Sequence, residues 1–115
     1  MSFRWPSKDP DETLDYSVDW SRFLDTATIT SVIWFVKSSV YNTKTRIDPG
    51  QTLTTASSSA TTDDIQNVAQ TNTDTVATIN IGGGQNNVEY TFFCQMTDNT
   101  GSTAERSIKI RLKER

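Results

Sequence analysis

The chain has 115 residues, enough for one small domain, and it contains 31 serine and threonine residues, no histidine and a net charge of −3. The lack of histidine excludes Ser-His-Asp and Cys-His catalytic systems, histidine metal sites and histidine pH switches. A single cysteine, Cys94, excludes an intrachain disulfide and a thiolate zinc cluster. Threonine is β-branched and favours strands, so the composition predicts a β-rich domain, and we expect neither a metal nor a cofactor.

The sequence also bounds the compartment and the kind of partner. No apolar run approaches the roughly 18 residues needed to cross a bilayer, and the polar residues 1–9 do not resemble a signal peptide. We therefore expect no membrane contact and a reducing, cytosol-like compartment. The negative net charge gives no electrostatic attraction for nucleic acid, so we expect no nucleic-acid partner.

The charges are unevenly spread along the chain. Six acidic residues lie within the first 25 positions: Asp9, Asp11, Glu12, Asp15, Asp19 and Asp25. Five basic residues lie within the last ten: Arg106, Lys109, Arg111, Lys113 and Arg115. This distribution has two interpretations. In the first, the first and last strands are neighbours, and their opposite charges compensate each other. In the second, the subunit is dipolar, and its acidic end binds the basic end of another copy or of a different partner.

Residues 1–12 are predicted to form an extended arm. Pro6 and Pro10 each lack the N–H donor that a regular central strand needs. Phe3 and Trp5 give the arm two apolar anchors, which dock either on the chain's own domain or on a neighbouring subunit. The remaining residues, 13–115, are predicted to form one domain.

Two strands are predicted next. Apolar and polar residues alternate over 13–20, which is typical of a strand with one buried face. Residues 21–26 indicate a turn. Residues 27–36 carry apolar side chains on both faces, which predicts a central strand, and its Trp34 is typical of the anchor of a sandwich core.

The middle of the chain has less regular patterns. A short strand is predicted around Val40 and Tyr41, and residues 48–50, Asp-Pro-Gly, predict a turn. Residues 51–64 indicate either an edge strand or a mobile loop. A helical turn is predicted over residues 64–70, because Asp63 or Asp64 could cap it.

Regular alternation returns in the last forty residues. Strands are predicted over 75–81 and 88–96, separated by a glycine loop at 82–84 that lacks the spacing of a phosphate-binding loop. Residues 98–101 predict a hairpin turn, followed by a last strand with Lys109, Arg111 and Lys113 on its outward face. Five to seven strands with little helix favour an all-β fold, an antiparallel β-sandwich.

Four stretches carry a resemblance to known proteins. The register Tyr90-x-Phe92-x-Cys94, followed by a hairpin, resembles the final strand pair of an immunoglobulin-like sandwich. More specific are three motifs: Lys8-Asp9-Pro10-Asp11-Glu12-x-Leu14-Asp15-Tyr16-x-x-Asp19-Trp20, the Thr-Ile-x-Ser-x-x-Trp stretch ending at Trp34, and Glu105-Arg106-Ser107-Ile108-Lys109-Ile110-Arg111-x-x-Glu114-Arg115. They resemble the fiber-tail adaptors and related immunoglobulin-like virion proteins of tailed bacteriophages, over roughly the first 35 and the last 30 residues.

The resemblance implies a structural protein of the phage virion, assembled in the host cytoplasm. It would be present in several copies, in a ring, and would bind the tail tube, nozzle or connector on one side and a tail fiber or a neighbouring subunit on the other. A head decoration protein of the capsid with the same fold is an alternative.

The sequence leaves two other classes of function as alternatives. Glu12, Asp15 and Asp19 are the only arrangement that suits paired-carboxylate catalysis, but acids on the outer face of a strand are usually just solvated, so we expect no enzyme. The second alternative is a carbohydrate-binding module that stacks sugars of the host on outward aromatic residues, which would be Trp5, Tyr41 and Phe93. The other aromatic residues are predicted to lie in the core: Tyr16, Trp20, Trp34, Tyr90 and Phe92.

The leading hypothesis is therefore a structural adaptor that works by burying surface against other virion proteins. Its predicted contact residues in the arm are Phe3, Arg4 and Trp5, inserted into a groove on a neighbouring subunit. Its second predicted contact is the basic face of the last strand, made of Lys109, Arg111 and Lys113. The alternative for that face is a solvated edge protected by its charges.

Overall fold

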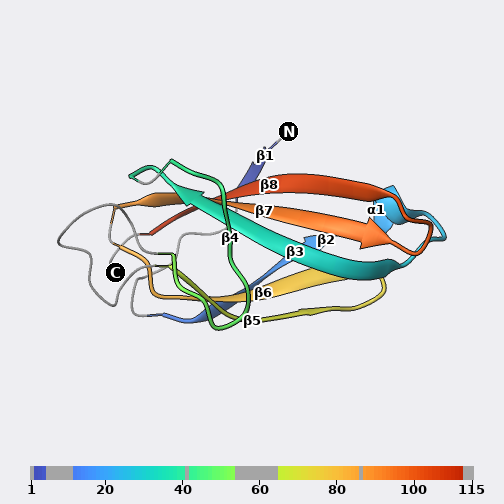
Figure 1. Ribbon diagram of the computed structural model, residues 1–115, viewed down its shortest axis with the longest axis horizontal. Coiled ribbons are helices and arrows are strands. Elements are labelled where there is room, and N and C mark those ends of the chain that lie inside the picture. The colour runs from blue at the N-terminus through green and yellow to red at the C-terminus, as the bar shows by residue number, and fades with distance from the viewer. Residues whose placement is uncertain (1, 5–11, 41, 54–64, 86, 113–115) are drawn as a thin grey trace.

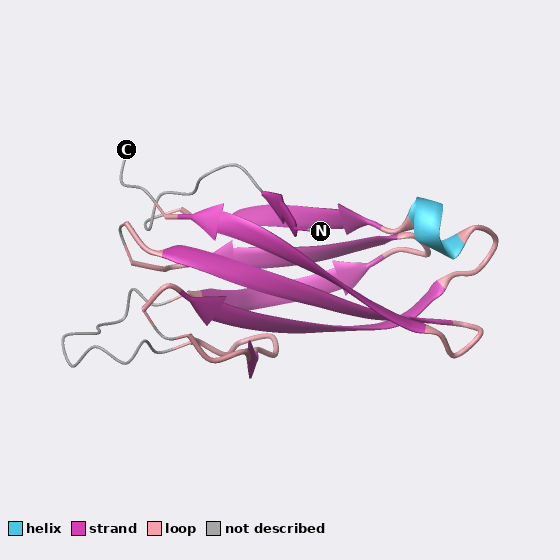
Figure 2. Ribbon diagram, turned by 90° about the horizontal axis from the view of Figure 1, so that it is seen from above, coloured by secondary structure: helices cyan, strands magenta, loops and turns pink. Residues whose placement is uncertain are grey.

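The computed structural model describes residues 2–4, 12–40, 42–53, 65–85 and 87–112. Over these residues two β-sheets pack face to face, and a short helix, α1 (Ser21–Leu24), lies at one end of the sandwich (Figure 1, Figure 2). The wider sheet has the strand order β1 (Ser2–Arg4), β8 (Thr103–Arg111), β7 (Glu89–Asp98), β3 (Ile29–Ser38) and β4 (Thr45–Arg46). The narrower sheet has the order β2 (Leu14–Asp19), β6 (Val76–Gly82) and β5 (Gln66–Asn72).

The predicted all-β sandwich is confirmed. Every strand pair is antiparallel except β1 and β8, which run parallel with Phe3 opposite Ile108. The finer assignment to the immunoglobulin-like folds stays a prediction. In the part of the chain that the structure describes, no helix has the length and apolar character needed to span a bilayer.

The strands with regular alternation form where the sequence predicts them. In β7 every second side chain from Tyr90 to Met96 is buried, and the residues between them are partly exposed. The predicted central strand is β3, which pairs with β7 on one side and with β4 on the other. The strands predicted over 13–20 and 75–81 are β2 and β6, which pair along their whole length from Leu14 opposite Ile81 to Asp19 opposite Val76.

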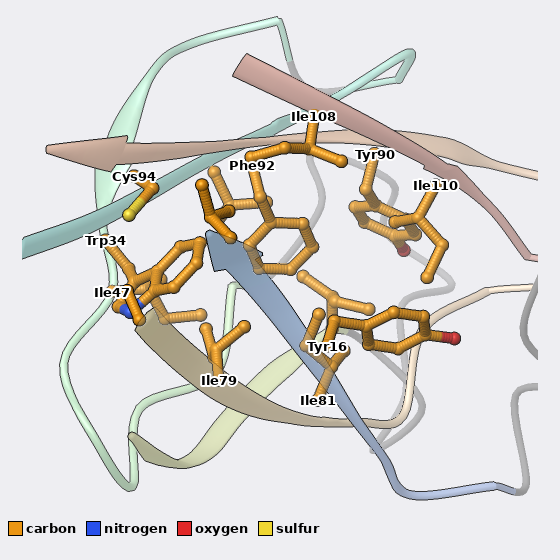
Figure 3. Close-up of a cluster of buried hydrophobic side chains, with 14 of the residues drawn as sticks. Tyr16, Trp34, Ile47, Ile79, Ile81, Tyr90, Phe92, Cys94, Ile108 and Ile110 are labelled. Atoms are coloured by element: carbon orange, nitrogen blue, oxygen red, sulfur yellow. The ribbon is translucent and has the colours of Figure 1, made fainter. Parts of the chain in front are cut away.

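The core lies between the two sheets. Figure 3 shows Phe92 at its centre, with Ile108 on the side of the wider sheet and Ile79 on the side of the narrower one. Trp34 and Cys94 lie opposite each other in the register of β3 and β7, and both are fully buried. Burying a side chain of the size of isoleucine or phenylalanine stabilises the fold by about 1.5–3 kcal/mol. The predicted core aromatic residues are confirmed as buried: Tyr16, Trp20, Trp34, Tyr90 and Phe92.

The glycine loop between β6 and β7 packs against the core. Gly84 has a φ of +101°, which favours glycine, and a Cβ there would approach the side chain of Leu112 to 2.8 Å. The backbone N–H of the next residue, Gln85, donates a hydrogen bond of 3.1 Å to the hydroxyl of Tyr90. The loop is therefore fixed to the start of β7 by close contact and by a hydrogen bond.

The prediction of a short strand around Val40 and Tyr41 is wrong at Val40, the residue of this pair that the structure describes. Val40 lies in a bend and is 50% exposed, while Tyr41 lies outside the described residues. The fourth strand forms later, at Thr45–Arg46, where it pairs with Val36 and Phe35 of β3. The chain reverses its direction between β3 and β4, which are antiparallel. The apolar residues Val40 and Tyr41 in the sequence do not indicate this reversal.

The helical turn predicted over residues 64–70 is also wrong, because β5 forms there. Its edge-strand conformation is stabilised by contacts far along the chain: the side-chain nitrogen of Asn67 donates to the carbonyl of Ile47 at 3.0 Å, and that of Gln70 donates to the carbonyl of Val32 at 3.1 Å. A bulge between Asn67 and Ala69 interrupts the alternation that would have marked a strand. For residues 51–64 the sequence predicts an edge strand or a loop. Thr52 forms a β-bridge to Gln66, and residues 54–64 lie outside the described ranges.

Candidate interaction surface

The outer side of the wider sheet carries aliphatic, aromatic and cationic side chains, and we call it the wide-sheet face. Strand register aligns its side chains in three rows across β3, β7 and β8: Ile33, Gln95 and Glu105; Phe35, Phe93 and Ser107; Lys37, Thr91 and Lys109. Except for Glu105, which is exposed, these residues are partly exposed, whereas their neighbours along each strand are mostly buried. The face is thus made by the side of each strand that the core does not use.

A lysine from the β3–β4 connection lies across this face. The ammonium of Lys44 is 4.8 Å from the ring centres of both Phe35 and Phe93, which are paired across β3 and β7. The same ammonium donates to the two carboxylate oxygens of Glu105 at 2.8 and 3.0 Å. Lys37 lies 5.9 Å from the ring centre of Phe93. Cation–π contacts of this kind are worth about 0.5–1 kcal/mol at exposed sites, so the lysines are held over the aromatic pair.

A shallow groove of about 380 Å³ opens beside Phe93. Its lining combines two lysines, one carboxylate, an aromatic ring and hydroxyl and amide groups: Lys37, Ser38, Ser39, Asn42, Glu89, Thr91, Phe93, Ser107 and Lys109. Such a mixture suits a protein segment that brings both apolar and acidic groups.

The structure brings the two predicted contact regions side by side. Residues Ser2–Arg4 form β1, which pairs with β8 so that Arg4 lies opposite Lys109. Lys109 is partly exposed and Arg111 is exposed on β8. Trp5 and Lys113 lie outside the described residues. The parallel pairing of the first and last strands has no signature in the sequence, because it joins segments more than one hundred residues apart.

The outer side of the narrower sheet has a different character, and we call it the narrow-sheet face. Its described residues are mainly carboxylate, hydroxyl and amide groups, joined by an alanine and two valines: Asp15, Ser17, Asp19, Val68, Ala69, Thr71, Val76, Thr78 and Asn80. Asn80 donates a hydrogen bond of 2.7 Å to Asp15, and the hydroxyls of Ser17 and Thr78 are 2.8 Å apart. A hollow of about 170 Å³ lies beside Asp15.

At the end of the sandwich near α1, Arg106 joins the two sheets. Its guanidinium carbon lies 4.6 Å from the ring centre of Trp20, and it donates a hydrogen bond of 3.0 Å to the carbonyl of Asp19. Phe23 packs edge-on against Trp20 with 5.8 Å between ring centres and is 47% exposed. Sequence reasoning missed Arg106. The available signal was its place between Ala104 and Ile108, where the alternation of the last strand calls for an apolar residue.

The described acidic residues of β2 and the described basic residues of β8 lie in different sheets. Asp15 and Asp19 are exposed on β2 in the narrower sheet, whereas Lys109 and Arg111 are partly exposed and exposed on β8 in the wider sheet. Figure 1 shows these two strands in different layers of the sandwich. Arg106 of β8 and Asp19 of β2 are one pair through which the two groups of charges approach each other.

The alternative functions can be compared with this geometry. The Phe93 ring proposed for sugar stacking lies under the ammonium groups of Lys44 and Lys37, while Trp5 and Tyr41 lie outside the described residues. Hydrogen bonds from Ser21 to the Asp19 carboxylate lower the pKa of Asp19, which is the opposite of what a general acid needs. Within the described ranges, no group of three or more acidic or cysteine side chains is placed to hold a metal ion.

Comparison with known proteins gives the family. No curated protein sequence matches the chain. The sequence model of a family described as podophage GP4 fiber-tail adaptor protein gp77 matches residues 8–45 and 39–111, that is, β2 through β8. The match includes the middle of the chain, which the motifs at the two ends did not cover. The phage resemblance is thus confirmed, and the chain belongs to the family of the podophage GP4 fiber-tail adaptor protein gp77.

Proposed function

We propose that this chain is a structural adaptor that joins a tail fiber to the phage tail by protein contact, without catalysis. The wide-sheet face is the observation that supports this proposal within the family assignment. Aromatic residues and cations are partly exposed there beside a groove of about 380 Å³, and aromatic residues are enriched in protein interfaces. The tail or its nozzle or connector is one partner, and the fiber is the other.

The arm and the basic last strand are proposed as further contacts. Phe3, Arg4 and Trp5 would bind a groove on a neighbouring subunit, and Lys109, Arg111 and Lys113 would bind acidic groups of a partner. The pairing of β1 with β8 supports a shared surface, because it sets Arg4 and Lys109 at the same level of the sheet. Several copies would be arranged in a ring on the tail after assembly in the host cytoplasm.

We infer that the sandwich is immunoglobulin-like. In that fold one sheet has the order B-E-D and the other the order G-F-C, with C′ added beyond C in variable-type domains. The orders β2-β6-β5 and β8-β7-β3-β4 follow the same pattern. The hydrogen bond between the Tyr90 hydroxyl and the backbone of Gln85, five residues upstream, has the form of a tyrosine corner at the start of strand F.

The adaptor function is tested by producing phage particles with and without this protein. Particles that lack it should contain tails but no attached fibers, and fibers should return when the wild-type protein is supplied during assembly. The variant Phe93→Ser should restore fewer fibers than the matched variant Ser31→Ala on the same strand pair. Particles that carry a full set of fibers in the absence of the protein would overturn the proposal.

A further inference from the structure

We propose that the wide-sheet face of one copy binds the narrow-sheet face of the next copy, head to tail. This inference rests on one part of the proposed function, namely that several copies of the chain assemble together. It assigns the occupant of the wide-sheet face: a second copy of this chain, contacted through the carboxylates of Asp15 and Asp19 and the polar groups between them.

The cations on the wide-sheet face are available for such a contact. Lys44 already bonds to Glu105, and Arg46 bonds to Asp48 at 2.9 Å. Lys37 and Lys109, in contrast, have no carboxylate within ion-pair distance among the described residues. They lie in one row on either side of Thr91, two strand spacings or about 10 Å apart, at the groove beside Phe93. An acidic side chain placed over Thr91 would reach both.

The narrow-sheet face offers the complementary groups. Asp15 and Asp19 are exposed and lie four residues apart on β2, which places them about 13 Å apart. The described part of this face carries no lysine or arginine. Between the carboxylates lie the mutually hydrogen-bonded hydroxyls of Ser17 and Thr78, and the hollow beside Asp15 has room for the end of a lysine. Opposite potentials on two faces of one molecule favour their mutual contact.

A symmetric contact between two wide-sheet faces is disfavoured by the same charges. It would bring Lys37 and Lys109 of one copy against the same cations of the other, and opposed like charges in an interface are unfavourable by several kcal/mol. A head-to-tail contact joins two different surfaces, so each copy still has one free face after binding. Repetition of such a contact closes into a ring or continues as an open stack.

The experiment measures the mass of the purified full chain by sedimentation equilibrium and native mass spectrometry. Wild type should form species larger than a dimer at high concentration and low salt. The variant Lys37→Glu/Lys109→Glu and the variant Asp15→Lys/Asp19→Lys should each weaken self-association on the order of 100-fold, which corresponds to about 2.7 kcal/mol. Matched charge reversals outside both faces, Arg22→Glu and Asp74→Lys, should leave self-association unchanged.

Mixing the variants separates a head-to-tail contact from a symmetric one. In the variant Lys37→Glu/Lys109→Glu, the wide-sheet face should bind neither another copy of the variant nor the wild-type protein. Its narrow-sheet face is unchanged. The reverse holds for the aspartate-to-lysine variant. In a mixture, the two variants should regain species larger than a dimer, because the intact faces still fit each other and the two reversed faces also carry opposite charges. A symmetric contact between wide-sheet faces would stop at a dimer. Because Asp19 also bonds to Ser21, the variant Asp15→Lys/Ser17→Lys serves as a second version with this bond intact.

Three results would overturn the inference. These are a wild type that stays monomeric at millimolar concentration, a double variant that associates as tightly as wild type while its thermal unfolding is unchanged, and a mixture of the two double variants that gives nothing larger than a dimer. A monomeric wild type that still attaches fibers to particles would refute the self-association alone. Fiber attachment without the protein would refute the proposed function and leave the measured self-association standing.

Discussion

Phe92 and Phe93 are neighbours in sequence with opposite roles in the structure. Phe92 is fully buried at the centre of the core, and Phe93 is partly exposed on the wide-sheet face. Phe92→Ala is expected to lower the free energy of unfolding by about 3–5 kcal/mol, because it leaves a cavity between the sheets. Phe93→Ala is expected to lower it by about 1 kcal/mol or less and to weaken fiber attachment and self-association instead.

Urea unfolding of the two variants, together with sedimentation and fiber counts, tests this pair. Each variant is the control for the other, since the same ring is removed at adjacent positions. Equal losses of stability would show that the face of Phe93 is part of the core, and unchanged attachment and association in Phe93→Ala would remove it from the interface.

Cys94 links the stability of the fold to alkaline pH. Burial raises the pKa of its thiol to about 11, partly offset by the indole of Trp20. The unfolded chain loses this proton near pH 9, while the folded chain holds it until about pH 11. The thiol's contribution is therefore fully present below pH 9 and is lost between pH 9 and 11, a total of roughly 3 kcal/mol.

This dependence is checked by urea unfolding at several pH values from 8 to 11. The variant Cys94→Ala should show a shallower decrease in the free energy of unfolding over that interval, whatever its stability at pH 8. In wild type the thiol should react with a disulfide reagent only as fast as the protein unfolds. Rapid reaction of the folded protein at pH 8 would contradict the expected pKa.

Asp98 organises the hairpin between β7 and β8. Its carboxylate accepts hydrogen bonds from the backbone N–H groups of Thr100 and Ser102 at 2.9 and 3.0 Å and from the hydroxyl of Thr100 at 2.6 Å. These bonds, first that of the Thr100 hydroxyl, lower the pKa of Asp98. Its contribution to stability is therefore present above about pH 3.8 and is lost as the pH falls through the lower value of the folded state.

Thermal unfolding below and above pH 4 tests the role of this turn. Asp98→Ala should lower the midpoint at pH 7, and it should flatten the dependence of the midpoint on acid pH relative to wild type. Asp74→Ala, which removes an exposed carboxylate in the β5–β6 turn, is the control and should change neither quantity. An equal effect of both variants would show that the Asp98 hydrogen bonds do not matter.

At the scale of elements, β1 is the strand with the least support from its own sequence. It has three residues and pairs only with β8, opposite Ser107, Ile108 and Lys109. A chain lacking residues 1–12 should still fold, because the two sheets and their core are kept, but it should fail to assemble. Its backbone amides between residues 106 and 110 should exchange hydrogen faster than in wild type, since one side of β8 becomes an edge.

Hydrogen exchange monitored by mass spectrometry checks the pairing of β1. The residues of β3, which lie between β7 and β4, are the internal control and should exchange at the wild-type rate. Unchanged protection in β8 would show that β1 does not pair with it, and normal incorporation of the shortened chain into particles would refute the role of the arm.

The elements that could be predicted from sequence are those whose alternation reports a buried face. β2, β6, β7 and β8 each have one side in the core and one side outside it, so the pattern of side chains follows directly from the packing. β5 was not predicted from the sequence because a bulge interrupts its alternation. Its polar residues Asn67 and Gln70 also form hydrogen bonds to Ile47 and Val32, which are distant in sequence.

The candidate surface was predictable only in part, for a related reason. Lys109 and Arg111 stand out in the sequence because they alternate with Ile108 and Ile110 in a strand with a clear inner side. Phe35 lies in a strand with apolar residues on both sides, so its outward direction is set by the pairing of β3 with β7. Lys44 lies in a connection, and only the folded structure shows that it crosses the face to Glu105.

At the scale of the whole molecule, the two broad sides differ in chemistry. The wide-sheet face combines cations with aromatic rings, while the narrow-sheet face combines carboxylates with hydroxyl and amide groups. A net charge of −3 describes neither side. The separation gives the subunit a direction, which fits the proposed contact with two different partners.

The margins of the two sheets have a consequence for solubility at high local concentration. β1 and β4, which flank the wider sheet, have only three and two residues, and β5 on the margin of the narrower sheet is bulged. On the opposite margin, β2 presents charged residues at Asp15 and Asp19. Short, bulged or charged margins resist the addition of another strand and hence the growth of fibrils. The proposed head-to-tail contact therefore joins faces and leaves the strand margins of neighbouring copies apart.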